Sequence, residues 1–215
     1  MRKQIVSCAV VLLAVSPVTV LAAPPQTRGG FWLSFGLGYG SARVECDQCI
    51  AGGREGSLAG WFRLGGTIGH KLLLGWEVNG WLKNDKGRLQ TSEDLARTLG
   101  NGGIIAVFYP RAASGFFVKA GGGLSYAGLP PRPTTFCPAT DLACLGAIDE
   151  GAHGNGFGLT AGVGYDIRIR TNLSITPDFT FSRGSPGDLK RKGQPAVVTG
   201  WRHDILAFGV GVTFH

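Results

Sequence analysis

The sequence predicts an all-β fold, an eight-stranded antiparallel up-and-down transmembrane β-barrel. Glycine supplies 36 of the 215 residues and charged residues only 16%, a composition that excludes acidic disordered chains and long helices. Segments in which apolar residues alternate with small or polar ones recur along the chain. These segments span about 10 residues or more, enough for a tilted strand to cross a bilayer.

The first 23 residues have the layout of a secretory signal peptide. Two basic residues precede the apolar run Ile5–Val15, and small residues follow up to Ala23. Pro17 interrupts the apolar stretch before it reaches the about 20 residues that a membrane-spanning helix needs. We therefore divide the chain into a cleaved signal peptide, residues 1–23, and one barrel domain, residues 24–215.

A period of two residues places eight strands in the barrel domain. One face of each strand carries large apolar side chains, and the other carries mostly glycine and small polar residues. The strands are expected at 31–40, 61–69, 72–81, 99–109, 116–126, 157–168, 173–181 and 205–214. A membrane barrel turns its apolar face to lipid, and the crowded lumen of a narrow barrel favours small residues. A soluble secreted barrel would instead leave the glycine-rich face toward water.

Aromatic residues near the strand ends predict the interfacial girdles of a membrane barrel. They are Phe31, Tyr39, Trp76, Tyr109, Phe116, Tyr126, Tyr165 and Phe214. In the strand 99–109 the apolar face is expected to carry Leu99, Ile105, Val107 and Tyr109.

The connections between the predicted strands alternate in length. Short turns are expected near 70–71, 110–114 and 169–172, and longer polar segments near 42–56, 83–97, 127–155 and 182–200. Membrane barrels combine short periplasmic turns with long extracellular loops in this way. The proline-rich 127–155 segment is the best candidate for contact with a partner outside the cell.

Four cysteines remain after the signal peptide, in the pairs Cys46/Cys49 and Cys137/Cys144. Export to an oxidising compartment favours disulfides, and we expect pairing within each pair, with cross-pairing as the alternative. A zinc site built from both pairs is disfavoured because no His or Asp follows at ligand spacing. We expect no metal and no cofactor.

Six charged residues lie on the polar faces of the predicted strands: Arg63, Glu77, Lys119, Asp166, Arg168 and Asp178. In a closed barrel they point into the lumen, where each buried charge needs a partner. We expect a salt-bridged plug in which Glu77 lies near Arg63 or Lys119. We expect Asp166 to lie near Arg168 or Asp178. The alternative is the selectivity lining of a narrow pore, for which eight strands leave little room.

Two further function classes are disfavoured by the residues. The formal net charge is +7, but the basic residues are scattered apart from Lys190–Lys192, so no nucleic-acid surface is predicted. An enzyme that modifies lipid A needs a hydroxyl nucleophile with a histidine base and a carboxylate. Only His203, beside Asp204, has a suggestive neighbour, and no His-x-Ser pair stands at strand spacing.

Three segments carry a family resemblance: the strand end Ala106–Pro110, the segment Gly115–Gly121, and the closing run Phe208–Phe214. With the signal peptide, they resemble the OmpA-like eight-stranded outer-membrane β-barrel family of Gram-negative bacteria. The resemblance implies a place in the outer membrane, contact with its lipid and lipopolysaccharide, and insertion by the barrel-assembly machinery. Family members commonly end on an aromatic residue, whereas this chain ends Phe214–His215.

The function expected from these observations is non-enzymatic. We expect an envelope structural role or a surface-interaction role in which the extracellular loops contact an extracellular ligand. The alternatives are a narrow, porin-like diffusion pore for small solutes and an enzyme that modifies lipid A.

Overall fold

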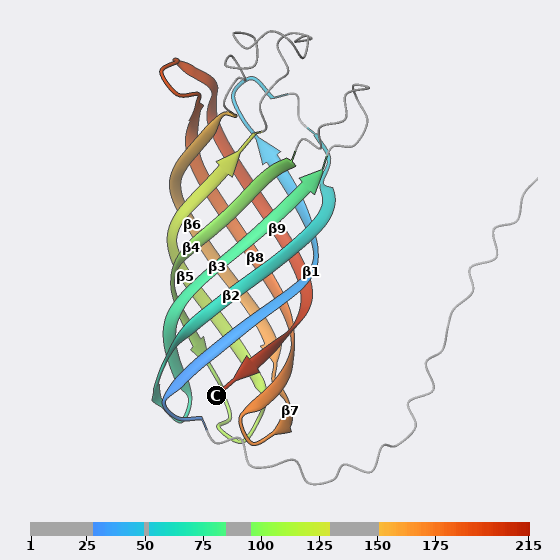
Figure 1. The fold of residues 1–215 in the computed structure, drawn as a ribbon, viewed down its shortest axis with the longest axis vertical. Helices are drawn as coiled ribbons and strands as arrows, with labels where there is room; N and C mark the ends of the chain where they lie inside the picture. The colour runs from blue at the N-terminus through green and yellow to red at the C-terminus, as the bar shows by residue number, and fades with distance from the viewer. Residues whose placement is uncertain (1–27, 50–51, 85–95, 130–150) are drawn as a thin grey trace, which may run out of the picture.

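The computed structural model describes residues 28–49, 52–84, 96–129 and 151–215, so the predicted signal peptide lies outside the described residues. Nine strands pair antiparallel in one closed sheet (Figure 1). They are β1 (Phe31–Glu45), β2 (Glu55–Gly69), β3 (Leu72–Asn84), β4 (Ala96–Phe108), β5 (Phe116–Gly128), β6 (His153–Tyr165), β7 (Ile167–Arg170), β8 (Leu173–Lys190) and β9 (Ala196–Phe214). The described residues contain no helix long and apolar enough to cross a membrane.

Strands β6 and β7 share one position in the ring. Only Asp166 separates them, and both pair with β8. The amide of Asp166 donates to the carbonyl of Gly115 at 2.9 Å, at the point where the strand is interrupted. Pairing of β1 with β9 closes the ring. The predicted eight-stranded up-and-down barrel is therefore confirmed, with its sixth strand broken at Asp166.

The two ends of the barrel differ in their connections. Residues 70–71, 109–115 and 171–172 form short connections at one end, which we call the turn end. Residues 46–54, 85–95, 129–152 and 191–195 connect strands at the other end, the loop end. The three predicted short turns are confirmed, whereas residues 85–95 and 130–150 of the predicted longer segments lie outside the described residues.

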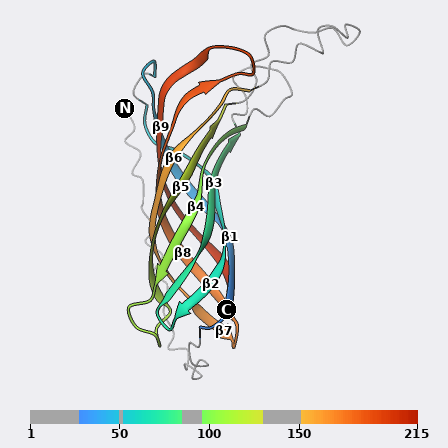
Figure 2. The same cartoon turned by 90° about the vertical axis from the view of Figure 1, so that its left-hand side faces the viewer.

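The fourth long segment was predicted wrongly. Residues 182–200 are mostly strand, because β8 runs to Lys190 and β9 begins at Ala196. Together they form a hairpin that rises at the loop end (Figure 2). Its outward face carries polar residues such as Arg183 and Ser185, so the period-two apolar signal that marks the other strands is missing here.

The outward face of the barrel is apolar along most strands. Leu37, Ile104 and Leu124, for example, are about two-thirds exposed. Seven of the eight predicted girdle aromatics also point outward, with exposed fractions between 41% and 65%. Tyr109 is the exception, because it is buried in the lumen with only 2% of its surface exposed.

The predicted apolar face of the fourth strand was inverted. Leu99, Ile105 and Val107 point into the lumen and are buried, whereas Ile104 and Phe108 point outward. Both faces of this strand carry large apolar residues, so alternation alone cannot say which of them meets lipid.

The lumen is filled by side chains in three layers. An apolar cluster at the turn end consists of Trp32, Leu73, Ile105, Val107, Tyr109 and Phe117. A second apolar cluster lies at the loop end and contains Ala42, Ala59, Trp81, Leu99, Ala127, Ala152, Leu189, Trp201 and Ile205. Between them lie buried charges. Narrow eight-stranded barrels have interiors that side chains fill in this way.

Candidate functional site

Four of the six predicted lumen charges meet in one cluster, which we call the charge quartet: Arg63, Glu77, Lys119 and Asp178. Arg63 on β2 stands directly opposite Glu77 on β3, and its guanidinium donates to that carboxylate. Arg63 also contacts Asp178 on β8 at 2.9 Å. Lys119 on β5 lies 3.0 Å from Glu77 and 3.1 Å from Asp178. Each cation therefore touches both carboxylates.

The charge quartet is neutral and buried. Its four side chains are at most 2% exposed, and its two positive and two negative charges balance. Because the members come from strands on different sides of the ring, the cluster spans the lumen. A buried charge without a partner is strongly unfavourable, so this balance is what allows four ionised groups to lie between two apolar layers.

Neutral polar side chains complete the hydrogen bonding of the carboxylates. Asn79 donates to Glu77 at 3.1 Å and to the hydroxyl of Thr160 at 3.0 Å. Thr180 donates to Asp178 at 2.5 Å. These partners were not predicted as site residues, although Asn79 and Thr180 each stand two positions after a predicted charge and so share its face.

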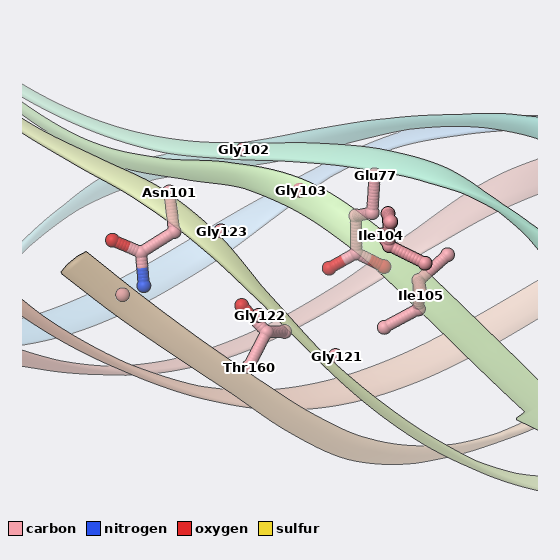
Figure 3. Close-up of a pocket in the computed structure, with 11 residues that line it drawn as sticks. Glu77, Asn101, Gly102, Gly103, Ile104, Ile105, Gly121, Gly122, Gly123 and Thr160 are labelled. Carbon is pink, nitrogen blue, oxygen red and sulfur yellow. The ribbon is translucent and has the colours of Figure 1, made fainter.

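The cavities beside the charge quartet are small. Figure 3 shows one of them, bordered by Glu77, Asn101 and Thr160 and by glycines of β4 and β5. Its volume is about 10 Å³, and a neighbouring cavity that touches Asn79 and Thr180 has about 20 Å³. Each offers room for about one water molecule.

Asp166 belongs to a separate network at the turn end. Its carboxylate accepts hydrogen bonds from Tyr109 at 2.6 Å and from Thr176 at 2.8 Å, and it lies 3.2 Å from the imidazole of His215. The cost of burying this carboxylate is offset by the hydrogen bonds from Tyr109 and Thr176 and by its contact with His215.

Of the two expected neighbours of Asp166, Arg168 interacts with it electrostatically, whereas Asp178 does not contact it. Asp178 lies in the charge quartet, where it is held by Arg63 and Lys119. The guanidinium of Arg168 donates to the carbonyl of Thr171 in the neighbouring turn. The break between β6 and β7 places Asp166 at the turn end, one layer away from Asp178.

Two further residues close the turn end. Arg28 stacks on the ring of Tyr109 at 3.4 Å and donates to the carbonyls of Ala112 and Ser114. The amide of His215 donates to the carbonyl of Asn172 at 3.1 Å. Neither residue was predicted as part of a site, since contacts this distant along the chain leave no local pattern.

The loop end carries a disulfide and a larger cavity. Cys46 and Cys49 are bonded, whereas Cys137 and Cys144 lie outside the described residues. A cavity of about 210 Å³ is bordered by Glu55, Trp81, Arg97 and Trp201, among others. Glu55 is paired with Arg97 and Lys83, each at 3.1 Å. Trp81 and Trp201 belong to the loop-end apolar layer, which lies between this cavity and the charge quartet.

Solved structures with a similar fold are outer-membrane proteins. Neisserial surface protein A matches with a TM-score of 0.50 at 16% identity, over 87% of this chain and 98% of that chain. The chain has the fold of an outer-membrane β-barrel. Ail, the attachment invasion locus protein of Yersinia pestis, matches this barrel with a TM-score of 0.48 at 13% identity, over 87% and 100% of the two chains. OprG from Pseudomonas aeruginosa matches with a TM-score of 0.42 at 11% identity, over 89% and 100%.

Comparisons with models of protein families and with curated proteins find no match for this barrel. The OmpA-like family in particular remains a prediction.

Proposed function

We propose that the protein is a non-enzymatic, non-conducting barrel of the outer membrane that serves as an envelope scaffold and interacts with partners through its loop end. The outward apolar face fits the lipid and lipopolysaccharide of that membrane. Insertion by the barrel-assembly machinery is part of the same proposal. The observation that carries it is the neutral, fully buried charge quartet between two apolar layers.

A narrow diffusion pore would need a continuous wet path through these layers. The cavities beside the charge quartet have room for about one water each, and Trp81 and Leu99 are buried in the loop-end apolar layer. Opening such a path would separate paired charges whose side chains are at most 2% exposed. The same packing that stabilises the barrel therefore opposes conduction.

The proposal of a non-enzymatic role draws on the surroundings of the histidines. His203 is buried in the lumen, 2% exposed, where a lipid substrate has no route to it. His215 is engaged with Asp166 at the turn end. Lipid A from a deletion strain should keep its acyl chains unchanged, and an altered acyl pattern that the wild-type gene restores would contradict this part of the proposal.

The decisive experiment is single-channel recording of the refolded barrel domain in a planar bilayer. A heat-shifted gel band would confirm that each sample is a closed barrel, and a porin in the same bilayer would show that the recording works. We expect no discrete openings. Openings whose size follows the salt concentration would overturn the proposal and identify the charge quartet as a selectivity lining.

A further inference from the structure

The outward-facing charges nearest the apolar band at the loop end gather on one side of the barrel. Strands β8, β9 and β1 are neighbours in the ring, and beyond the band their outward faces carry Arg183, Asp204 and Arg43. The described residues of β3 to β6 place no Lys, Arg, Asp or Glu on the outward face beyond the band, because Lys83 and Arg97 stand on the lumen side. The charged patch is therefore local and does not encircle the barrel.

Three arginines, which we call the arginine triad, surround Asp204: Arg43, Arg54 and Arg183. Asp204 stands directly opposite Arg43 on β1 and opposite Arg183 on β8. The Nε atom of Arg183 lies 3.6 Å from the Asp204 carboxylate. Arg54, which immediately precedes β2, donates to the carbonyl of Ser41 at 2.7 Å and to that of Asp204 at 3.5 Å. Three like charges are thus held around one carboxylate.

The positive charge of the arginine triad exceeds the negative charge of its neighbours. Asp204 offsets one of the three charges. Arg43 also lies 3.1 Å from Glu45, but Glu45 stands directly opposite Arg202 on β9, so this second row adds no net charge. A surplus of two positive charges remains on the outward face.

The arginine triad is open to a ligand. The side chains of Arg43 and Arg183 are 48% and 60% exposed, and Arg54 is exposed as well. Ion pairs this exposed contribute little stability, so an incoming anion can compete with them. The next acidic residues along β1 and β8, Asp47 and Asp188, already accept hydrogen bonds within the loop end.

The height of the arginine triad coincides with the headgroups of the membrane. Arg183 stands two residues beyond the outward Phe181 on β8, and Arg43 stands four residues beyond the outward Tyr39 on β1. At about 3.3 Å per residue and a tilt of about 40°, these spacings correspond to roughly 5 to 10 Å beyond the hydrocarbon. The headgroup layer is roughly 5 to 8 Å thick in each leaflet. The guanidinium groups therefore lie where lipid phosphates lie.

The surface directly below the arginine triad is apolar and continuous with it. Tyr39, Phe181 and Phe208 are exposed on the outward faces of β1, β8 and β9, and Tyr39 stands opposite Phe208. A lipid whose phosphate contacts the arginines would lay its acyl chains along these rings. Both parts of one lipid molecule thus find complementary surface on the same three strands.

We propose that the arginine triad binds a phosphate monoester of a lipopolysaccharide molecule, whose acyl chains lie on the aromatic rings below it. The inference rests on the proposed function, which assigns the loop end to the outer leaflet. Guanidinium groups bind phosphate oxygens in a bidentate manner. A phosphate monoester carries about 1.5 to 2 negative charges at neutral pH, which matches the surplus on the triad. A phosphodiester carries one charge and leaves part of the surplus uncompensated.

The test is native mass spectrometry of the folded protein in detergent, with bisphosphorylated lipid A as the probe. Lipid A from which both phosphates have been removed keeps the acyl chains, and phosphatidylglycerol offers a phosphodiester. We expect bisphosphorylated lipid A to bind about tenfold more tightly than either of them. Equal binding of the dephosphorylated lipid would overturn the proposal by assigning the contact to acyl chains alone. Equal binding of phosphatidylglycerol would overturn the assignment to a monoester.

A set of variants locates the site on the barrel. R43Q/R54Q/R183Q should bind bisphosphorylated lipid A about tenfold more weakly. The matched control, K71Q/R111Q/R170Q, removes three exposed cations at the turn end and should bind like the wild type. Heat-shifted gel bands would confirm that every variant is folded. Equal losses in the two triple variants would contradict a specific site, because they would mean that any exposed cation serves.

The variant D204N gives a prediction of the opposite sign. It removes the carboxylate inside the arginine triad and keeps all three arginines, so it should bind bisphosphorylated lipid A several-fold more tightly. Unchanged or weaker binding would show that the charge surplus does not hold the lipid. Conductance, recorded separately, decides the proposed function whatever the arginine triad binds.

Discussion

Replacing Glu77 with glutamine removes one of the four buried charges and keeps the size and shape of the side chain. In the charge quartet Glu77 bonds both cations, and its side chain is 2% exposed. After the change, Asp178 alone faces Arg63 and Lys119, so the buried layer carries a net positive charge. Removing one partner of a buried ion pair costs about 3 to 5 kcal/mol. We expect the free energy of unfolding to fall by that amount.

The assay is urea unfolding of the barrel in lipid vesicles, followed by the heat-shifted gel band and tryptophan fluorescence. The matched control is Glu45→Gln, which breaks the surface pair with Arg43. That pair has a similar length, 3.1 Å, but its side chains are 48% and 54% exposed, and exposed pairs contribute about 0 to 1 kcal/mol. The double variant E77Q/K119Q restores neutrality and should show a coupling free energy of about 1 to 3 kcal/mol.

The reasoning fails if Glu77→Gln and Glu45→Gln destabilise the barrel equally. Equal effects would mean that water screens the quartet as it screens the surface pair, and hence that the lumen is wet. The structure would then support a conducting path, and the proposed function would have to be abandoned together with the plug.

Three further perturbations test other layers of the structure. Gly38→Ala should destabilise the barrel by about 1 to 3 kcal/mol, since its Cβ would lie 2.1 Å from a backbone oxygen, whereas nothing lies within 4 Å of the Cβ that Gly66→Ala adds; equal unfolding free energies would contradict a tightly closed lumen. Asp166→Asn should lower the free energy of unfolding by about 1 to 3 kcal/mol, because the amide nitrogen cannot accept the hydrogen bonds that Tyr109 and Thr176 donate to the carboxylate, and an unchanged value would show that this network does not stabilise the turn end. Leu37, 66% exposed on the outward face, should lower folding stability in vesicles by about 2 to 4 kcal/mol when changed to arginine, and a neutral effect would mean that this face does not meet lipid.

Strand positions were predictable wherever one face is apolar and the other small. The segment 157–168 is the clearest case, because its alternation fixes both the strand and the side that faces the lumen. The prediction failed in two physically distinct situations. In β4 both faces are apolar around Ile104 and Ile105, so the inward side depends on register with neighbouring strands. Beyond the membrane neither face of a strand needs to be apolar. Residues 182–190 of β8 therefore lack the alternation of apolar and small residues that predicts the other strands.

The sequence predicts which residues belong to the candidate site better than it predicts which of them touch. Alternation of the two faces along each strand identifies Arg63, Glu77 and Lys119 as residues that face the lumen. Which of them meet across the lumen depends on the tilt and stagger of eight strands, which no single segment encodes. The break at Asp166 is a further example, because it assigns this carboxylate to the turn-end network and leaves Asp178 to the charge quartet.

The glycine content and the charge quartet have a common physical origin. Glycines face one another across neighbouring strands on the lumen side, as in Gly36 opposite Gly211 and Gly38 opposite Gly209, where an added Cβ would lie less than 3 Å from other atoms. This close approach leaves a narrow lumen that side chains fill. Charges in such a space must balance, because each uncompensated one costs several kcal/mol. The proposed function follows from this packing, because a lumen filled by paired charges opposes conduction and leaves the loop end as the surface that we propose contacts other molecules.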